Sequence, residues 1–228
     1  MTEPKERKPR ARRKPPAGDD VSLKAAVLAA ALPHVPFDGF TDKVLAEAAA
    51  EAALDRICVA RLFPQGPLSL VEAFSDSIDA EMEQRLAKLK LAQMKIRDRI
   101  RTAVTTRLEL LKANREAARR AAAFLTLPPH AAMGAKLLYR TVDTIWRAIG
   151  DTSTDFSFYT KRAILAAVYS STLMRWFTDD SEGETATQEF LTLRIANVMQ
   201  FEKLKADIRE RTKGWPSFAD FMRGGKRA

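Results

Sequence analysis

The chain has 228 residues, of which 46% are hydrophobic and 29% are charged, and this size suits one globular domain with appendages. Its one cysteine, Cys58, excludes an internal disulfide framework. Its two histidines exclude a His-rich metal centre but leave room for an all-carboxylate magnesium or calcium site. The uncharged run at residues 163–174 is shorter than the ~20 apolar residues of a transmembrane helix, so no membrane-spanning segment is expected.

The net charge of +9 lies mostly at the two ends of the chain. Residues 1–20 carry seven bases and four acids, a net charge of +3, and residues 203–228 carry eight bases and three acids, a net charge of +5. Residues 21–202 have a net charge of only +1. This distribution favours tethering to an anionic membrane or a polyanion over a basic surface on the folded domain that would recognise nucleic acid.

Residues 1–20 are expected to be disordered, because they combine many basic residues with four prolines. Glu3, Glu6 and the prolines also distinguish this stretch from a mitochondrial presequence, which is poor in acids and able to form an amphipathic helix. We therefore expect a cytoplasmic protein of a bacterium.

The chain after residue 21 has helical periodicity, few glycines and no period-2 run, which predicts an all-α fold of about nine helices and no strands. Breaks are expected at Pro33, at Pro64 and around Gly183, and Thr41 has the residue type of an N-cap. The expected helices are residues 22–32, 41–54, 55–63, 68–91, 95–113, 115–125, 131–149, 158–177 and 184–205.

The expected helix at residues 158–177 is apolar nearly all round after Arg162. Such a helix is typical of the centre of a bundle, because its apolar side chains cannot all face one neighbour. The pattern alone favours a core helix. The alternative is that some of these side chains line a cavity.

Sequence motifs for catalysis are absent. The nine glycines form no G-x-G-x-x-G, Walker A or G-x-S-x-G motif, and neither histidine belongs to a Glu-x-x-His pair. Cys58 lies between two apolar residues and is expected to be a buried hydrophobe. The sequence therefore predicts a protein that is not an enzyme, with no catalytic residues, no metal and no cofactor.

Three short helices followed by longer ones, with the sequence FDGFT at residues 37–41, resemble the TetR regulator plan. The resemblance implies a helix-turn-helix in residues 21–67 and a ligand pocket among the later helices. Residues 22–68 have a net charge of −1, however, whereas DNA readout needs positive charge. We expect no specific nucleic-acid binding. The alternative is a TetR-type repressor that senses a lipid or quinone.

A more specific resemblance is carried by DTSTDF at residues 151–156 and SFYTKRAILAAVY at residues 157–169. This run resembles the signature of the Coq-nine family, accessory proteins of ubiquinone (coenzyme Q) biosynthesis. The resemblance implies a TetR-like homodimer that takes isoprenoid quinone intermediates and phospholipid from the membrane and presents them to a di-iron hydroxylase. It also implies peripheral association with the bacterial inner membrane. The sequence departs from the family at Phe158, where members commonly have Trp.

Candidate lipid-binding residues are the inward-facing positions of the expected helices 131–149 and 158–177. The guanidinium of Arg162 suits a lipid phosphate or head group, and its alternative role is an ion pair with Asp151 or Asp155. The predicted lipid-binding set is Arg162, Leu138, Val142, Ile145, Trp146, Ile164, Leu165, Val168 and Tyr169.

Three further surfaces are predicted. The opening of the helix at residues 158–177 should dock the hydroxylase through Asp155, Phe158 and Tyr159, unless the two aromatics pack inward. Residues 206–228 should form a short amphipathic helix that contacts the membrane, unless it docks on its own domain. Homodimer contacts are expected between residues 68 and 205, near Trp176, Phe190, Leu191, Ile195 and Val198. The predicted membrane-contact residues are Trp215, Phe218, Phe221 and Met222.

Overall fold

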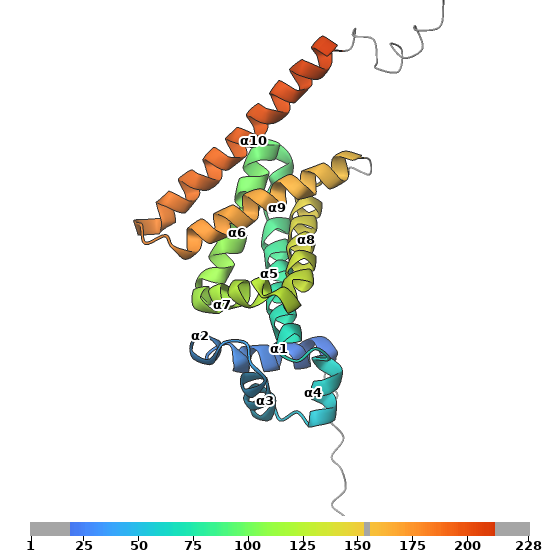
Figure 1. Cartoon of the computed structure of the whole chain (residues 1–228), viewed down its shortest axis with the longest axis vertical. Helices are drawn as coiled ribbons and strands as arrows, with labels where there is room; N and C mark the ends of the chain where they lie inside the picture. The colour runs from blue at the N-terminus through green and yellow to red at the C-terminus, as the bar shows by residue number, and fades with distance from the viewer. Residues whose placement is uncertain (1–18, 153–155, 213–228) are drawn as a thin grey trace, which may run out of the picture. The chain divides into compact units, whose positions relative to one another are not determined.

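The computed structural model describes residues 19–152 and 156–212, and every regular element in these ranges is helical (Figure 1). The prediction of an all-α fold is confirmed. The elements are α1 (Asp20–Ala31), α2 (Val35–Asp38), α3 (Asp42–Glu51), α4 (Arg56–Leu62), α5 (Pro67–Ala87), η1 (Leu91–Gln93), α6 (Ile96–Lys112), α7 (Arg115–Thr126), η2 (Pro128–His130), α8 (Ala131–Ala148), α9 (Phe156–Phe177), η3 (Glu182–Glu184) and α10 (Thr185–Thr212).

The helix boundaries follow local capping signals. Thr41 accepts a hydrogen bond from the Val44 amide at 3.3 Å, which confirms it as the N-cap of α3, and Asp55 caps α4 through the Cys58 amide at 2.7 Å. The sequence did not predict α2, a single turn that ends at Gly39 with φ of +71°. Nor did it predict that α10 continues beyond residue 205 to Thr212.

The chain divides into two compact units. Among the described residues, the first unit contains residues 19–89 and 106–144, and the second contains residues 90–105, 145–152 and 156–212, so α6 and α8 each contribute to both. In the first unit α1 packs against α3 and α5, and α2 packs against α7. The fully buried side chains of this unit include Val27, Val35, Val44, Leu70, Val71, Met82 and Leu86.

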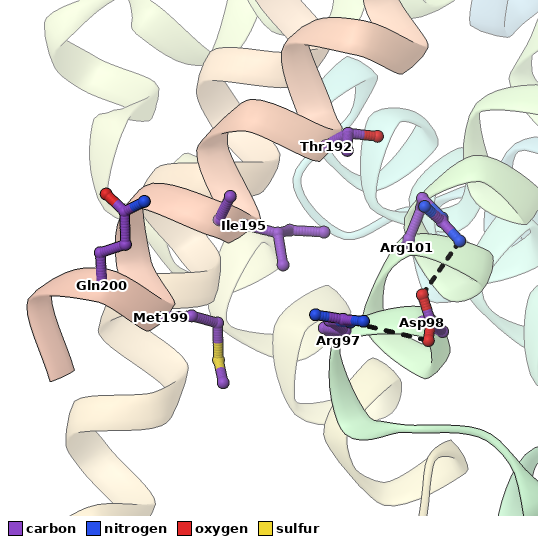
Figure 2. Close-up of a pocket in the computed structure, with 8 residues that line it drawn as sticks. Arg97, Asp98, Arg101, Thr192, Ile195, Met199 and Gln200 are labelled. Carbon is purple, nitrogen blue, oxygen red and sulfur yellow. Dashed lines mark hydrogen bonds and ion pairs between the residues drawn. The ribbon is translucent and has the colours of Figure 1, made fainter. Parts of the chain in front are cut away.

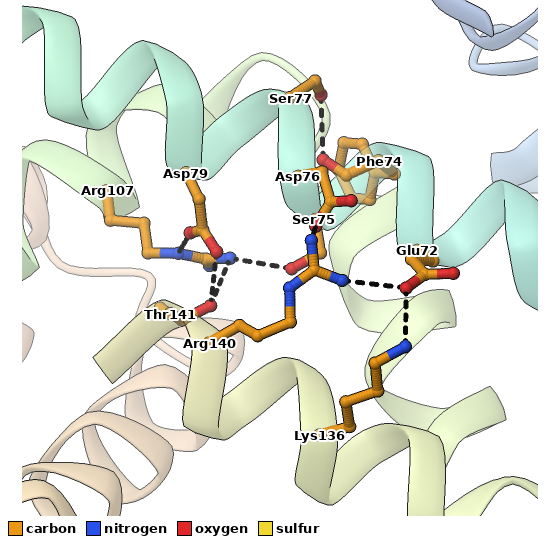
Figure 3. Close-up of polar contacts among 10 residues, drawn as sticks. All are labelled: Glu72, Phe74, Ser75, Asp76, Ser77, Asp79, Arg107, Lys136, Arg140 and Thr141. Atoms are coloured by element: carbon orange, nitrogen blue, oxygen red, sulfur yellow. Dashed lines mark hydrogen bonds and ion pairs between the residues drawn. The ribbon is translucent and has the colours of Figure 1, made fainter. Parts of the chain in front are cut away.

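A buried ion pair joins α5 to α6 in the first unit (Figure 3). Arg107 Nε donates to Asp79 Oδ1 at 2.7 Å, and Thr141 Oγ1 donates to Asp79 Oδ2 at 2.8 Å. Arg107 Nη2 also reaches the Ser75 and Thr141 hydroxyls, both at 3.3 Å. All of the charged oxygen and nitrogen atoms just named are therefore satisfied inside the helix packing.

The ion pairs continue toward the surface between α5 and α8. Arg140 contacts Glu72 at 2.8 Å and Asp76 at 2.6 Å, and Lys136 contacts Glu72 at 3.1 Å (Figure 3). Burial raises the pKa of Asp76, and the Arg140 guanidinium opposes that rise. Removing one partner of these half-exposed pairs should cost less stability than removing one partner of the buried pair.

In the second unit, α9 packs against α10, the next long helix in the chain. Trp176, Leu191 and Ile195 are buried there, at 0%, 1% and 8% exposure. These three side chains were expected to supply surface for a homodimer, but packing within a single chain already buries them. Among the residues of α9 and α10 whose exposure is described, the large exposed hydrophobic side chains are those of Tyr159, Met174, Leu193 and Met199.

Asp179 closes the α9–α10 turn. Its carboxylate accepts hydrogen bonds from the amides and hydroxyls of Ser181 and Thr187, at 2.5–2.9 Å. Hydrogen bonds from the Ser181 and Thr187 hydroxyls are the main cause that holds the pKa of Asp179 far below its usual range, and the bonds from the two amides add to it. The charged form therefore stabilises the turn.

We expect Asp179→Ala to lower the free energy of unfolding by ~0.5–2 kcal/mol, the usual cost of losing a side-chain cap. Because the folded-state pKa is depressed, this contribution is present above pH ~4 and is lost as the pH falls below that value. Denaturant unfolding of both proteins at pH 7 and at pH 3 checks this. An Asp179→Ala penalty that is the same at both pH values would contradict the assignment.

Candidate functional site

An apolar cavity of about 360 Å³ lies within the second unit. Its walls come from the start of α6, the α8–α9 connection, α9 and α10. The apolar lining residues are Ile96, Ile100, Trp146, Ile164, Leu165, Val168, Ile195, Val198 and Met199, and the others are Arg97, Gly150, Asp151, Ser157, Thr160 and Lys161. The cavity is thus apolar along α9 and α10 and polar beside the first turns of α9.

Hydrogen bonds from three elements hold the α8–α9 connection at the cavity wall. Trp146 Nε1 donates to the Lys161 carbonyl at 3.2 Å, and Lys161 Nζ contacts Asp151 Oδ1 at 2.7 Å. Arg99 donates to the carbonyl of Ile149 at 3.0 Å, and its other guanidinium nitrogens bind two carbonyls just before α6. Gly150 follows with φ of +87°, a backbone conformation that favours glycine.

Arg162 is buried, with 4% of its surface exposed. Its Nη1 lies 3.5 Å from Asp151 Oδ2 and donates to the Phe158 carbonyl at 3.2 Å, while the guanidinium carbon lies 3.3 Å from the Phe158 ring centroid. The ion pair with Asp151 is the alternative role that the sequence had left open. The guanidinium is thus engaged within the protein.

Four of the predicted lipid-binding residues meet at the cavity: Trp146, Ile164, Leu165 and Val168. Ile145 and Tyr169 are buried in the same unit, at 0% and 4% exposure. Leu138 and Val142 belong to the first unit. Sequence reasoning missed the contributions of α6 and α10, namely Ile96, Ile100, Ile195, Val198 and Met199.

A second hollow, of about 600 Å³, adjoins the cavity between α6 and α10 (Figure 2). This hollow and the cavity share three lining residues, Arg97, Ile195 and Met199. Figure 2 shows Arg97, Asp98 and Arg101 of α6 on one side, and Thr192, Ile195, Met199 and Gln200 of α10 on the other. We call this hollow the arginine groove.

Comparison with known proteins identifies the family of the chain. The COQ9 family model matches residues 131–202, which include α8, α9 and the cavity-lining part of α10. The ubiquinone biosynthesis protein coq9 of Schizosaccharomyces pombe is 30% identical over 200 residues, which cover 86% of this chain and 76% of that protein. The chain belongs to the COQ9 family.

Mammalian COQ9 proteins are similar to this COQ9-family chain over a smaller share of their own length. The mitochondrial ubiquinone biosynthesis proteins COQ9 of Bos taurus and Homo sapiens are each 35% identical over 184 residues, which cover 78% of this chain. The chain spans 57% and 58% of their respective lengths.

The TetR-like fold expected for a COQ9-family chain is confirmed by a solved structure. The crystal structure of a TetR transcriptional regulator from Nitrosomonas europaea superposes with a TM-score of 0.60, covering 77% of this chain and 97% of that one. At 19% sequence identity, this similarity shows the fold alone.

Some of the remaining predicted site residues of the COQ9-family chain lie outside the described ranges. Asp155 and the membrane-contact residues Trp215, Phe218, Phe221 and Met222 are among those not described. Phe158 is half-buried and contacts Tyr159 edge-on at 5.1 Å between ring centroids, whereas Tyr159 itself is 67% exposed.

Two absences characterise the described part of this COQ9-family chain. Its helices include none with the length and hydropathy needed to cross a membrane. Among its His, Cys, Asp and Glu residues, no three gather closely enough to hold a metal ion.

Proposed function

We propose that this chain is a non-catalytic lipid-binding protein of ubiquinone biosynthesis that holds isoprenoid quinone intermediates and presents them to a di-iron hydroxylase. The names of its COQ9 relatives support the pathway. The observation that carries the proposal is the apolar cavity formed by α6, α9 and α10. Membrane contact by the segment containing Trp215 and Phe218 belongs to the same proposal.

The size and lining of the cavity suit part of such a ligand. Its volume of about 360 Å³ lies within the range of roughly 300–1,000 Å³ that is usual for small-molecule pockets. A polyprenyl tail is insoluble, so a carrier must offer it apolar surface, which Ile100, Ile164 and Val198 supply here. The polar residues Ser157, Thr160 and Lys161 then suit the ring end of the intermediate.

DNA regulation is disfavoured by the charges of the helix-turn-helix region. Lys43 Nζ lies 3.4 Å from Asp38, and Arg61 lies 2.6 Å from Asp20 Oδ1. Both bases are therefore paired with acids that lie beside them and contribute little net charge for binding DNA phosphates.

Lipids that purify with the protein test the proposed function directly. We expect mass spectrometry of organic extracts from the purified full-length chain to detect isoprenoid quinone intermediates, because the cavity shields their tails from water. An unrelated protein of similar size that binds no lipid, purified from the same cells by the same steps, serves as a blank. Absence of any lipid, together with no binding of quinone intermediates in vitro, would refute the function.

Docking of the hydroxylase through the start of α9 is a second, separable part of the proposal. Tyr159 is the exposed aromatic there, and loss of a central aromatic anchor typically weakens a complex by ≥ ~2 kcal/mol, or roughly thirtyfold. We expect Tyr159→Ala to reduce capture of the hydroxylase by about this factor. Tyr139→Ala, at another exposed tyrosine, should leave capture unchanged. Equal capture by both variants would place the partner elsewhere.

A further inference from the structure

Met199 is an exposed methionine in the walls of two hollows. From α10 it lines both the apolar cavity and the arginine groove, and 40% of its surface is exposed. Figure 2 shows its thioether sulfur on the α10 side of the groove. The side chain therefore meets water while it forms part of the apolar wall.

The other methionines of the described ranges lack one of these two properties. Met82 is fully buried, and Met94 and Met133 are half-buried. Met174 of α9 is 51% exposed, but it lines neither hollow. Among the residues whose exposure is described, Met199 is thus the one methionine that is both exposed and part of the cavity wall.

A thioether sulfur is open to two-electron oxidation by hydrogen peroxide. Its lone pair attacks one peroxide oxygen, so that an S–O bond forms and the O–O bond breaks. The new hydroxyl group on sulfur passes its proton to the departing hydroxide, which leaves as water. Sulfur loses the two electrons that peroxide gains. The product is methionine sulfoxide, a polar side chain in place of an apolar one, and exposed methionines react first because peroxide arrives through water.

A sulfoxide at position 199 would change how the cavity wall receives a hydrocarbon tail. Removing water from an apolar thioether is favourable, but removing water from a polar sulfoxide oxygen costs free energy. The side chains of Ile195 and Val198, which lie in the same wall, cannot donate a hydrogen bond to that oxygen. The oxidised wall should therefore hold a tail less tightly than the reduced wall.

We infer that Met199 is a redox-sensitive site, at which hydrogen peroxide forms methionine sulfoxide and thereby weakens the binding of lipid in the cavity. This inference rests on the proposed lipid-binding function and adds a regulation of the same site. A partner that activates dioxygen at iron is a local source of peroxide. Methionine sulfoxide reductases reverse the modification, so the loss of binding is a reversible state.

Treatment of the full-length chain with dilute hydrogen peroxide tests the inference, with coenzyme Q that carries two isoprene units as the probe. Quenching of tryptophan fluorescence follows binding, since Trp146 lines the cavity. Peptide mass spectrometry measures the sulfoxide at each methionine. We expect oxidation of both Met199 and Met174, and an affinity for the quinone that falls roughly tenfold, from the cost of desolvating one polar group. Methionine sulfoxide reductases of both epimer classes should restore the affinity.

Matched variants assign the effect to one sulfur atom. Met199→Leu has no thioether, so its affinity should be the same before and after peroxide treatment. Met174→Leu should still lose affinity roughly tenfold after treatment, like wild type. Met199→Gln places a polar side chain in the wall without oxidation and should bind roughly tenfold more weakly than wild type, whereas Met174→Gln should not. Circular dichroism of all variants checks the fold.

Three results would overturn the redox site and leave the proposed function standing. The first is unchanged quinone affinity in wild-type chain whose Met199 has been converted to the sulfoxide. The second is an equal loss of affinity in peroxide-treated Met199→Leu, which would place the sensitive group elsewhere. The third is oxidation of Met174 while Met199 stays unmodified. Failure of the untreated wild-type chain to bind the quinone counts against the lipid-binding function and the inference together.

Discussion

Ile164→Glu is expected to lower the amount of lipid that purifies with the protein by roughly tenfold to a hundredfold. Ile164 lines the apolar cavity from α9, so the new carboxyl group would be buried against a hydrocarbon tail. Such burial costs ~1–3 kcal/mol in proteins, which gives this range of affinity. Mass spectrometry of extracts, normalised to protein, measures the change.

Ala167→Glu is the matched control for this result. Ala167 lies on the same helix, is exposed and does not belong to the cavity lining, so the same new charge meets water there. Wild-type lipid content in Ala167→Glu, with matching helical content of the two variants, would attribute the loss to the cavity. If Ile164→Glu retains wild-type lipid, the ligand does not occupy this cavity.

Asp79→Ala is expected to lower the free energy of unfolding by ~3–5 kcal/mol, the largest stability effect that we expect in the first unit. The substitution leaves the Arg107 guanidinium buried at 5% exposure without its carboxylate. The cost comes mainly from burying the Arg107 guanidinium without the Asp79 carboxylate rather than from the lost attraction between the partners. Urea unfolding, followed by circular dichroism, measures it.

Two comparisons test the cause of this destabilisation. Glu81→Ala removes a half-exposed partner of Arg85 on the same helix α5, and should cost under ~1 kcal/mol. The double variant Asp79→Leu/Arg107→Met removes both buried charges and should recover much of the stability lost in Asp79→Ala. A double variant that is as unstable as Asp79→Ala would contradict the explanation by an unpaired charge.

Local signals in the sequence account for most of the helix positions. Thr41 and Asp55 cap their own helices three residues on, and Pro67 begins α5, so these boundaries depend on neighbours in the chain. The turn α2 was missed because its four residues are too few to show a helical period. The apolar character of α9 likewise indicated its burial but not its neighbours.

The family motif located part of the candidate site and missed the rest. It pointed to α9, where Ile164, Leu165 and Val168 do line the cavity. Nothing in residues 96–101 or 195–199 marks them as the opposite walls, because their approach to α9 depends on packing between distant segments. The buried ion pair of Asp79 and Arg107 could not be predicted from the sequence for the same reason, since its members lie 28 positions apart in the chain.

By itself, the sequence determined the all-α class, the N-cap Thr41 and the resemblance to one family, because each depends on residues close together in the chain. Only the tertiary structure decided what each charged side chain meets. Arg162 looked suited to a ligand from its place at the end of an apolar helix, yet Asp151 and Phe158 enclose it. Arg97 and Arg101 look like ordinary exposed bases in the sequence, but α10 places an apolar wall opposite them, because helix packing brings together residues almost a hundred positions apart.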